Sequence, residues 1–157
     1  IGQLIHKYGE RKSLGFEYVG LVIIFSAYGM VASLPVGTKA LFGLPLIGFA
    51  AASLFFLDHA LFAMSLAIKT YFQKIADPAD IAPTAGVAFS INHIAAVGLP
   101  VALGIVWVTN NAAVFWIGAA MALVSFVLSR LVPHTPVPGH EVVWDAAVQD
   151  GIVEVAD

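Results

Sequence analysis

From Ile81 to Ser129 the chain contains no Asp, Glu, Lys or Arg. A helix on the surface of a soluble protein carries charged side chains every turn or two, so this run cannot coat a water-soluble domain. Hydrophobic residues make up 60% of the 157 residues and charged residues only 11%, whereas soluble proteins are about half apolar. The sequence therefore predicts a protein that is embedded in a lipid bilayer.

Four apolar stretches are each long enough to span a bilayer, for which a helix needs about 20 predominantly apolar residues. None shows the alternating pattern of a membrane β-barrel strand, so the backbone amides must be satisfied within helices. We therefore expect an all-α membrane protein with four transmembrane helices. The expected segments are a loop over residues 1–13, helices over 14–34, 40–74, 84–108 and 112–132, and an acidic tail over 133–157.

The connections between these helices are short and contain Pro, Gly, Asp or Asn, which makes consecutive helices antiparallel neighbours. Basic residues near helix ends then fall on one side of the bilayer, and Lys39 stands alone on the other. Because cytoplasmic loops are rich in Lys and Arg, we expect both ends in the cytoplasm and the helices in the cell (inner or plasma) membrane. The basic residues on the cytoplasmic side are Lys7, Arg11, Lys12, Lys69, Lys74 and Arg130.

The tail and the missing residue types exclude several classes of function. Five of the ten acidic residues lie in the last seventeen positions, which contain no Lys or Arg, so no nucleic-acid partner is expected. The Pro-rich segment after Val132 has too few apolar residues for a core and is expected to be mobile. The chain has no cysteine, which excludes thiolate metal sites. No cofactor is expected, and a metal site from Asp58, His59 and His93 is disfavoured because adjacent helical residues diverge by about 100°.

The opening segment, Gly2-Gln3-Leu4-Ile5-His6-Lys7-Tyr8-Gly9-Glu10-Arg11-Lys12, resembles the cytoplasmic signature loop of the major facilitator superfamily. That loop has a Gly, three residues, Asp-Arg, one residue, another Gly and a basic cluster. Here His6 stands at the acidic position and Lys7 at the Arg position. Glycines permit tight turns, and the cations can hold helix carbonyls or a carboxylate such as Glu17. The residues of this candidate conformational loop are Gly2, Lys7, Gly9, Arg11 and Lys12.

The order of a loop, four helices and a cytoplasmic tail is similar to helices nine to twelve of that twelve-helix family. Gly98-Leu99-Pro100 and Gly104 resemble its glycine-rich eleventh helix. The resemblance covers about Gly2 to Val132 and implies that this chain is the C-terminal portion of a twelve-helix bundle. Its partners would then be the lipid bilayer, a small-molecule solute and the remaining eight helices of the parent transporter.

Asp58 and His59 lie near the middle of the helix expected over 40–74, where a charged side chain costs at least about 2.5 to 3.5 kcal/mol. On a continuous helix they share one arc of about 140° with Ser65, Lys69, Thr70 and Gln73. This polar face indicates a helix that lines an aqueous cavity, with Asp58 as a protonatable or cation-binding group. His59 would tune Asp58 or relay a proton to it. The alternative is an inter-helix hydrogen-bond cluster that holds the bundle, with Lys69 reaching to the interface.

The next helix carries Asn92 and His93, which lie closer to the cytoplasmic end than Asp58. His93 shares a face with small residues and is expected to be functional, whereas Asn92 points away from Ser90 and is expected to be structural. Besides its pairing with the loop cations, Glu17 is expected to favour the dipole of the first helix. The candidate substrate and proton pathway is therefore Asp58, His59, Ser65, Lys69, Asn92 and His93.

These features predict transport of a small solute by a secondary, proton-coupled carrier that rocks two helical bundles about a central site. One alternative is a small self-associating four-helix membrane protein with Glu17 or Asp58 at a symmetric interface. Another is a membrane enzyme with a buried Asp-His pair. The sequence has no Gly-x-Ser-x-Gly, no His-Glu-x-x-His and no cysteine nucleophile, so we expect no enzymatic activity.

Overall fold

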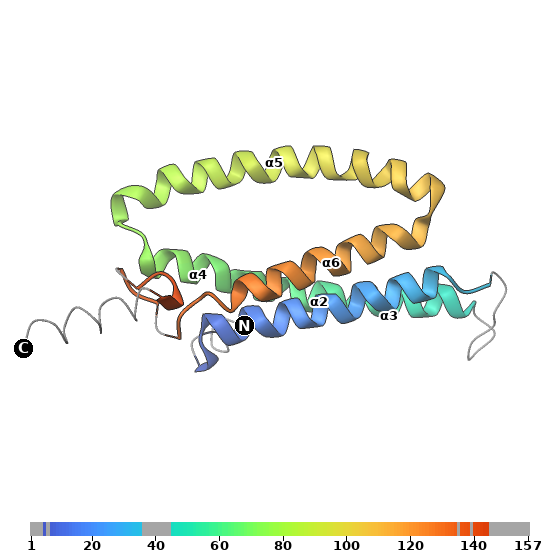
Figure 1. The fold of residues 1–157 in the computed structure, drawn as a ribbon, viewed down its shortest axis with the longest axis horizontal. Helices are drawn as coiled ribbons and strands as arrows, with labels where there is room; N and C mark the ends of the chain where they lie inside the picture. Colours follow the sequence, from blue (N-terminus) through green and yellow to red (C-terminus); the bar gives the residue numbers. More distant parts are fainter. Residues whose placement is uncertain (1–4, 6, 36–44, 135, 139, 145–157) are drawn as a thin grey trace, which may run out of the picture.

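The computed structural model describes residues 5, 7–35, 45–134, 136–138 and 140–144, and most of these residues are helical. Four helical segments are long and apolar enough to cross a membrane, with α3 to α4 counted as one span from Leu46 to Ile75. The expectation of an all-α chain with four membrane-length helices is therefore confirmed. The elements are α2 (Glu10–Ala32), α3 (Leu46–Phe62), η2 (Ala63–Ser65), α4 (Leu66–Ile75), α5 (Pro78–Thr109) and α6 (Asn111–Ser129) (Figure 1).

Helix α2 is the centre of the packed part of the molecule, because α6, α3, η2 and α4 all pack against it. It runs antiparallel to α3 and α4, and successive contacts along the pair define the register. From one end to the other, Glu10 lies beside Lys74, Leu14 clusters with Ala67, Gly20 lies beside Leu61, and Tyr28 lies beside Ala51.

The packing of α2 on α6 depends on small residues that let the two helices approach closely. A Cβ atom at Gly29 would lie 2.9 Å from the indole ring of Trp116, and a Cβ atom at Gly118 would lie 3.1 Å from the ring of Phe25. Near the first of these contacts, Tyr28 stacks on Phe115 with 5.0 Å between the ring centroids. These contacts bring the end of α2 to the beginning of α6, so the two helices are antiparallel.

The helix expected over 40–74 is described from Leu46 and is interrupted by the 3₁₀ turn η2. Three 3₁₀ residues rotate α4 by about 60° relative to a continuous α-helix, since they turn 120° per residue instead of 100°. As a result Ala67 is buried and Lys74 reaches α2, whereas Lys69 and Gln73 are exposed. The turn widens the polar arc expected from Asp58 to Gln73 from about 140° to about 180°, because Lys69, Thr70 and Gln73 all follow it.

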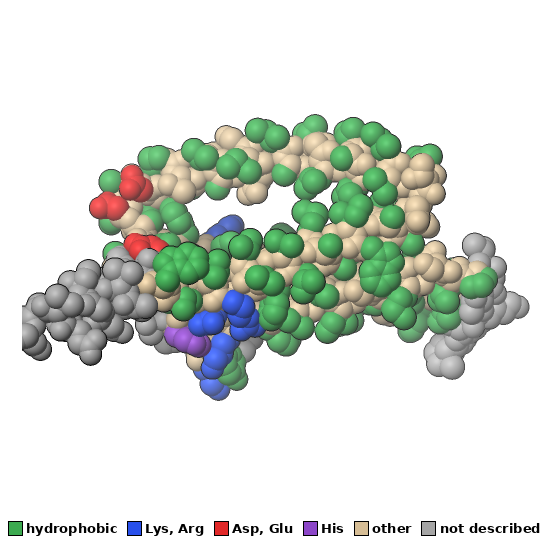
Figure 2. All heavy atoms as spheres, viewed as in Figure 1, with side chains coloured by type: hydrophobic (Ala, Val, Ile, Leu, Met, Phe, Trp, Pro, Cys, Tyr) green, Lys and Arg blue, Asp and Glu red, His purple; other side chains and the backbone are tan. Residues whose placement is uncertain are grey.

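Helix α5 begins at Pro78, earlier than the expected residue 84. Asp77 caps it by accepting the N–H of Ala79 at 2.8 Å, and Pro at the first helical position has no N–H that needs a partner. In the described part of the chain, α5 buries none of its residues although it is the longest helix. Figure 1 shows α5 bowing away from α2 and α6, and Figure 2 shows that side chains leave the space beneath it open.

The first part of the acidic tail packs against the helices. Pro133 and Pro136 are buried, and the N–H of Val143 donates to the carbonyl of Leu131 at 3.0 Å. The hydroxyl of Tyr71 on α4 donates to the carbonyl of Glu141. The expectation of a mobile tail is therefore wrong for its described residues up to 144, and 145–157 lie outside the described residues.

The charged side chains visible in Figure 2 gather toward one end of the molecule, which we call the charged end. It comprises the start of α2, the link between α4 and α5, and the end of α6. Because basic residues mark cytoplasmic loops, we expect this end to face the cytoplasm.

Single cysteines test this orientation, since the chain has none of its own. We expect Ala79→Cys and His134→Cys to react with a membrane-impermeant maleimide only from the cytoplasmic side, and Thr109→Cys only from the opposite side. Met121→Cys, in the middle of α6, is the control that should react from neither side. Labelling of residues 79 and 109 from the same side would show that α5 does not span the membrane.

Candidate functional site

Asp58 lies on the face of α3 that packs against α2. The residues of α3 that are partly buried recur every three or four positions, and Asp58 falls in this series between Leu54 and Leu61. Two contacts between α2 and α3 flank Asp58. On one side Leu61 lies beside Gly20, and on the other the Tyr28 hydroxyl donates a 3.2 Å hydrogen bond to the Ala51 carbonyl. The carboxyl is thus half-buried, with 32% of its side chain exposed, opposite the middle of α2.

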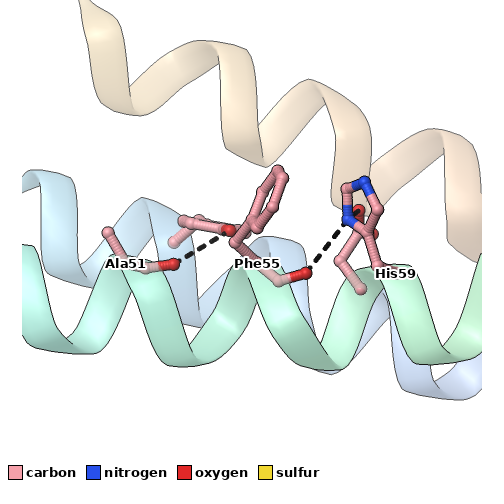
Figure 3. Close-up of polar contacts among 5 residues, drawn as sticks. Ala51, Phe55 and His59 are labelled. Atoms are coloured by element: carbon pink, nitrogen blue, oxygen red, sulfur yellow. Dashed lines mark hydrogen bonds and ion pairs between the residues drawn. The ribbon is translucent and has the colours of Figure 1, made fainter.

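His59 is adjacent in sequence but lies in a different environment. Its side chain is 61% exposed, and its Nδ1 atom lies 3.8 Å from Oδ2 of Asp58. Nδ1 also lies 3.1 Å from the carbonyl oxygen of Phe55, and the imidazole sits 4.1 Å from the Phe55 ring between centroids (Figure 3). Because a carbonyl only accepts hydrogen bonds, we assign the proton to Nδ1, which leaves Nε2 as the free acceptor of the neutral ring.

His93 on α5 repeats this arrangement. Its Nδ1 lies 3.1 Å from the carbonyl oxygen of Phe89, and the two rings lie 4.0 Å apart between centroids. The shared sequence pattern is Phe-x-x-(Asp or Asn)-His, in Phe55-Phe56-Leu57-Asp58-His59 and in Phe89-Ser90-Ile91-Asn92-His93. The spacing of four residues from Phe to His is the sequence signal for this arrangement, because it places both rings on one face of a helix. In both helices a preceding phenylalanine and a backbone carbonyl orient the imidazole.

The structure brings only part of the expected pathway together. Asp58 and His59 are adjacent on α3, which packs against α2, whereas the exposed Asn92 and His93 lie on α5, which packs against α6. Ser65 lies in the turn η2 and Lys69 is exposed on α4, beyond the break in the helix. The described residues therefore form two separate Asp/Asn-His pairs and no single polar cavity.

The loop expected over residues 1–13 is wrong for its described residues, because Lys7 and Tyr8 are helical and α2 begins at Glu10; the expected turn is present at Gly9. Gly9 precedes α2 with φ of 80°, a left-handed conformation that glycine adopts without strain. This agrees with the tight turn expected at this glycine. Lys7 and Lys12 are exposed and Arg11 is partly buried, with the Lys7 ammonium 5.5 Å from the centre of the Tyr8 ring. Gly2 lies outside the described residues.

Glu10 and Lys74 form an ion pair that was not predicted from the sequence. The carboxylate of Glu10 has only 3% of its side chain exposed and lies 2.6 Å from the ammonium of Lys74. This bond joins the first turn of α2 to the last turn of α4 at the charged end. No sequence motif indicates it, because it depends on the antiparallel register of two distant helices.

Charge reversal at residue 74 tests this ion pair. Lys74→Glu places a second carboxylate against buried Glu10, and we expect a loss of about 1–2 kcal/mol of stability, at the lower end for buried pairs because Lys74 is half-exposed. The double variant Glu10→Lys/Lys74→Glu should recover at least half of that loss in thermal unfolding in detergent. Lys69→Glu, at an exposed lysine, is the control. An equal loss in the control would show that the effect is general to negative charge on α4.

Glu17 is also buried on α2, and its Oε2 atom has no hydrogen-bond partner among the described residues. The expected pairing of Glu17 with the cations of the signature loop is therefore wrong. Lys7 and Lys12 are exposed instead, and Lys74 pairs with Glu10.

Comparison with family models, with curated proteins and with solved structures finds no significant match to this chain. Three features of the described residues indicate a function: a half-buried carboxyl opposite the middle of α2, two oriented imidazoles and a helix, α5, that buries no residue.

Proposed function

We propose that this chain is the C-terminal portion of a major facilitator-type secondary carrier, corresponding to helices nine to twelve, and that the carrier couples movement of a small solute to protons. The observation that carries the proposal is Asp58, an acid that is half-buried between two helices of membrane length. A carboxylate at membrane depth is costly and is found chiefly on ion and substrate pathways.

The exposure of α5 is evidence for the further helices that this proposal requires. Large apolar side chains project from α5 into open space, among them Ile94, Val97, Ile105 and Val108, each more than half exposed. Polar Asn92 and His93 interrupt this apolar surface. In the proposed twelve-helix bundle, part of this surface would contact other helices of the parent transporter and part would contact lipid.

The coupling chemistry would be carried by Asp58 and His59. In the complete carrier, a proton from water in the cavity between the two bundles would bind the Asp58 carboxylate and remove its charge, which lowers the cost of packing α3 against α2. The free Nε2 of His59 can accept a proton from the cavity, so His59 serves as a second acceptor beside the carboxyl. Release of the proton on the other side of the membrane completes the cycle as the two bundles rock about the site.

Charge movement by the full-length protein tests the proposal across several classes of solute. Proteoliposomes on a solid-supported membrane would be exposed to sugars, amino acids, organic anions and organic cations under an imposed proton gradient. We expect a transient current for at least one class, which disappears when the proton gradient is removed. No solute-dependent current in any class, from protein that is folded and correctly inserted, would contradict the assignment.

The reading frame distinguishes this proposal from its closest alternative. About eight further hydrophobic helices should be encoded before Ile1. A start codon immediately before Ile1 would instead support a small self-associating membrane protein, in which a second copy covers the exposed surface of α5. In that case chemical cross-linking in native membranes would show dimers or higher oligomers of this chain.

A further inference from the structure

Two buried acids on α2 lie on the same face but differ in their partners. Glu10 and Glu17 have 2% and 5% of their surface exposed, and their spacing of seven residues returns to nearly the same direction on a helix. Glu10 binds the ammonium of Lys74 at 2.6 Å. Glu17 has a buried Oε2 atom with no hydrogen-bond donor among the described residues.

The register of the helices places Glu17 at the 3₁₀ turn. Leu14 clusters with Ala67 and Gly20 lies beside Leu61, so Glu17, halfway between, lies at the level of η2 (Ala63–Ser65). The turn packs against α2. It contributes Ala63, Met64 and Ser65, none of which carries a charge.

Charged and titratable groups on the neighbouring elements are engaged elsewhere. On α4, Lys74 binds Glu10, Lys69 is exposed, and the Tyr71 hydroxyl donates to the tail. At the end of α6, the Arg130 guanidinium lies 4.4 Å from the centre of the Phe126 ring and beside Gly15.

On α3, Asp58 and His59 lie about two turns away in the register, toward the middle of the span. On α2 itself, Arg11 and Lys12 lie in the first two turns and Tyr18 follows Glu17. None of these groups forms an ion pair with Glu17 within the described part of the chain.

An ionised carboxylate that is buried without a donor costs several kcal/mol, and binding a proton removes that cost. We propose that Glu17 is a proton-binding site, separate from Asp58, formed where α2 packs against the 3₁₀ turn between α3 and α4. The proton passes from water to a carboxylate oxygen and returns to water on release. The inference goes beyond the transport assignment and does not depend on it.

Release of the proton leaves a negative charge on Glu17 that needs a hydrogen-bond donor. The adjoining turn η2 can move to let water supply that donor. A 3₁₀ turn within a helix has poorer hydrogen-bond geometry than an α-helix and often marks a hinge. Loss of the proton from Glu17 therefore loosens the contact between α2 and η2, which admits water to the carboxylate.

Infrared spectroscopy of the full-length protein in lipid tests proton binding directly, through the C=O stretch of a protonated carboxyl recorded across a pH titration. We expect a pH-dependent band that Glu17→Gln removes, Glu17→Asp shifts, and Glu10→Gln retains, because Glu10 is equally buried but paired. The same band should persist in Asp58→Asn. Absence of any band sensitive to residue 17 while the protein stays folded, or its loss in Glu10→Gln, would overturn the proposal.

Alkylation of Met64→Cys on η2 tests the coupled loosening. The thiol is compared at each pH in a background with Glu17 and in one with Glu17→Gln, so the ordinary pH dependence of thiol reactivity cancels. We expect the alkylation rate with Glu17, divided by the rate with Glu17→Gln, to rise with pH as Glu17 loses its proton. A ratio that stays constant would overturn the coupling to η2. Failure to find a transported solute would leave both readouts unaffected, so the two proposals fail separately.

Discussion

Asp58→Asn is expected to abolish uphill solute uptake by the full-length protein while exchange of solute across the membrane continues. Asparagine keeps the size and hydrogen-bonding capacity of the side chain but cannot bind and release the coupling proton. The half-buried position of Asp58 against α2 allows the substitution without a change of packing. Uptake into proteoliposomes under an inward proton gradient, compared with counterflow exchange in the same vesicles, measures the effect.

Asp80→Asn is the matched control, since it removes an exposed acid in the first turn of α5. It should leave concentrative uptake unchanged. His59→Gln should give an intermediate result, because it removes a proton acceptor beside the carboxyl but leaves the carboxyl itself. Concentrative uptake at the wild-type level in Asp58→Asn would contradict the coupling role.

Gly29→Leu should destabilise the helical bundle by about 1–3 kcal/mol, the range for overpacking a close contact. A Cβ atom at this position would lie 2.9 Å from the Trp116 ring, and a rigid indole cannot turn aside as a flexible side chain can. The gain of up to ~1 kcal/mol in helix propensity offsets only part of this loss. Thermal unfolding in detergent, followed by circular dichroism, measures the change.

Gly48→Leu is the control for this substitution, because a Cβ atom at Gly48 on α3 meets nothing within 4 Å. It should be neutral or slightly stabilising, and an equal loss there would show that glycine itself, not close packing, is required. Gly98 on α5 has the same open surroundings. Destabilisation by Gly98→Leu in the full-length protein would show that another helix covers this face of α5.

Hydropathy predicted the number of helices because each span requires an apolar run of fixed length, which no tertiary contact alters. The predicted start of α5 was wrong because Asp77 and Pro78 were interpreted as a loop, although an acid followed by Pro is also a helix start. The turn η2 was not predicted, since Ala63-Met64-Ser65 contains neither Gly nor Pro. The turn packs against α2, and this contact between distant segments is not visible in the local sequence.

The same distinction applies to the candidate site. The strain-free role of Gly9 was predictable because left-handed backbone favours one residue type. The partners of Glu10 and Glu17 were not predictable, because they depend on how α2 and α4 align across many intervening residues. The sequence identified Asp58 and His59 as polar residues at membrane depth. It could not show that Asp58 is half-buried and His59 exposed, because this depends on which face of α3 contacts α2.

Pro100 lies within α5, and proline has no N–H, so the carbonyl of Ala96 cannot receive the usual hydrogen bond from four residues ahead. An unsatisfied carbonyl in hydrocarbon costs several kcal/mol. Ala96 lies less than one turn beyond His93. The Ala96 carbonyl and the His93 imidazole are thus neighbouring polar groups on an otherwise apolar helix, and lipid acyl chains cannot form hydrogen bonds with them. Hydration or a neighbouring hydroxyl, not lipid, is the environment that suits this stretch of α5.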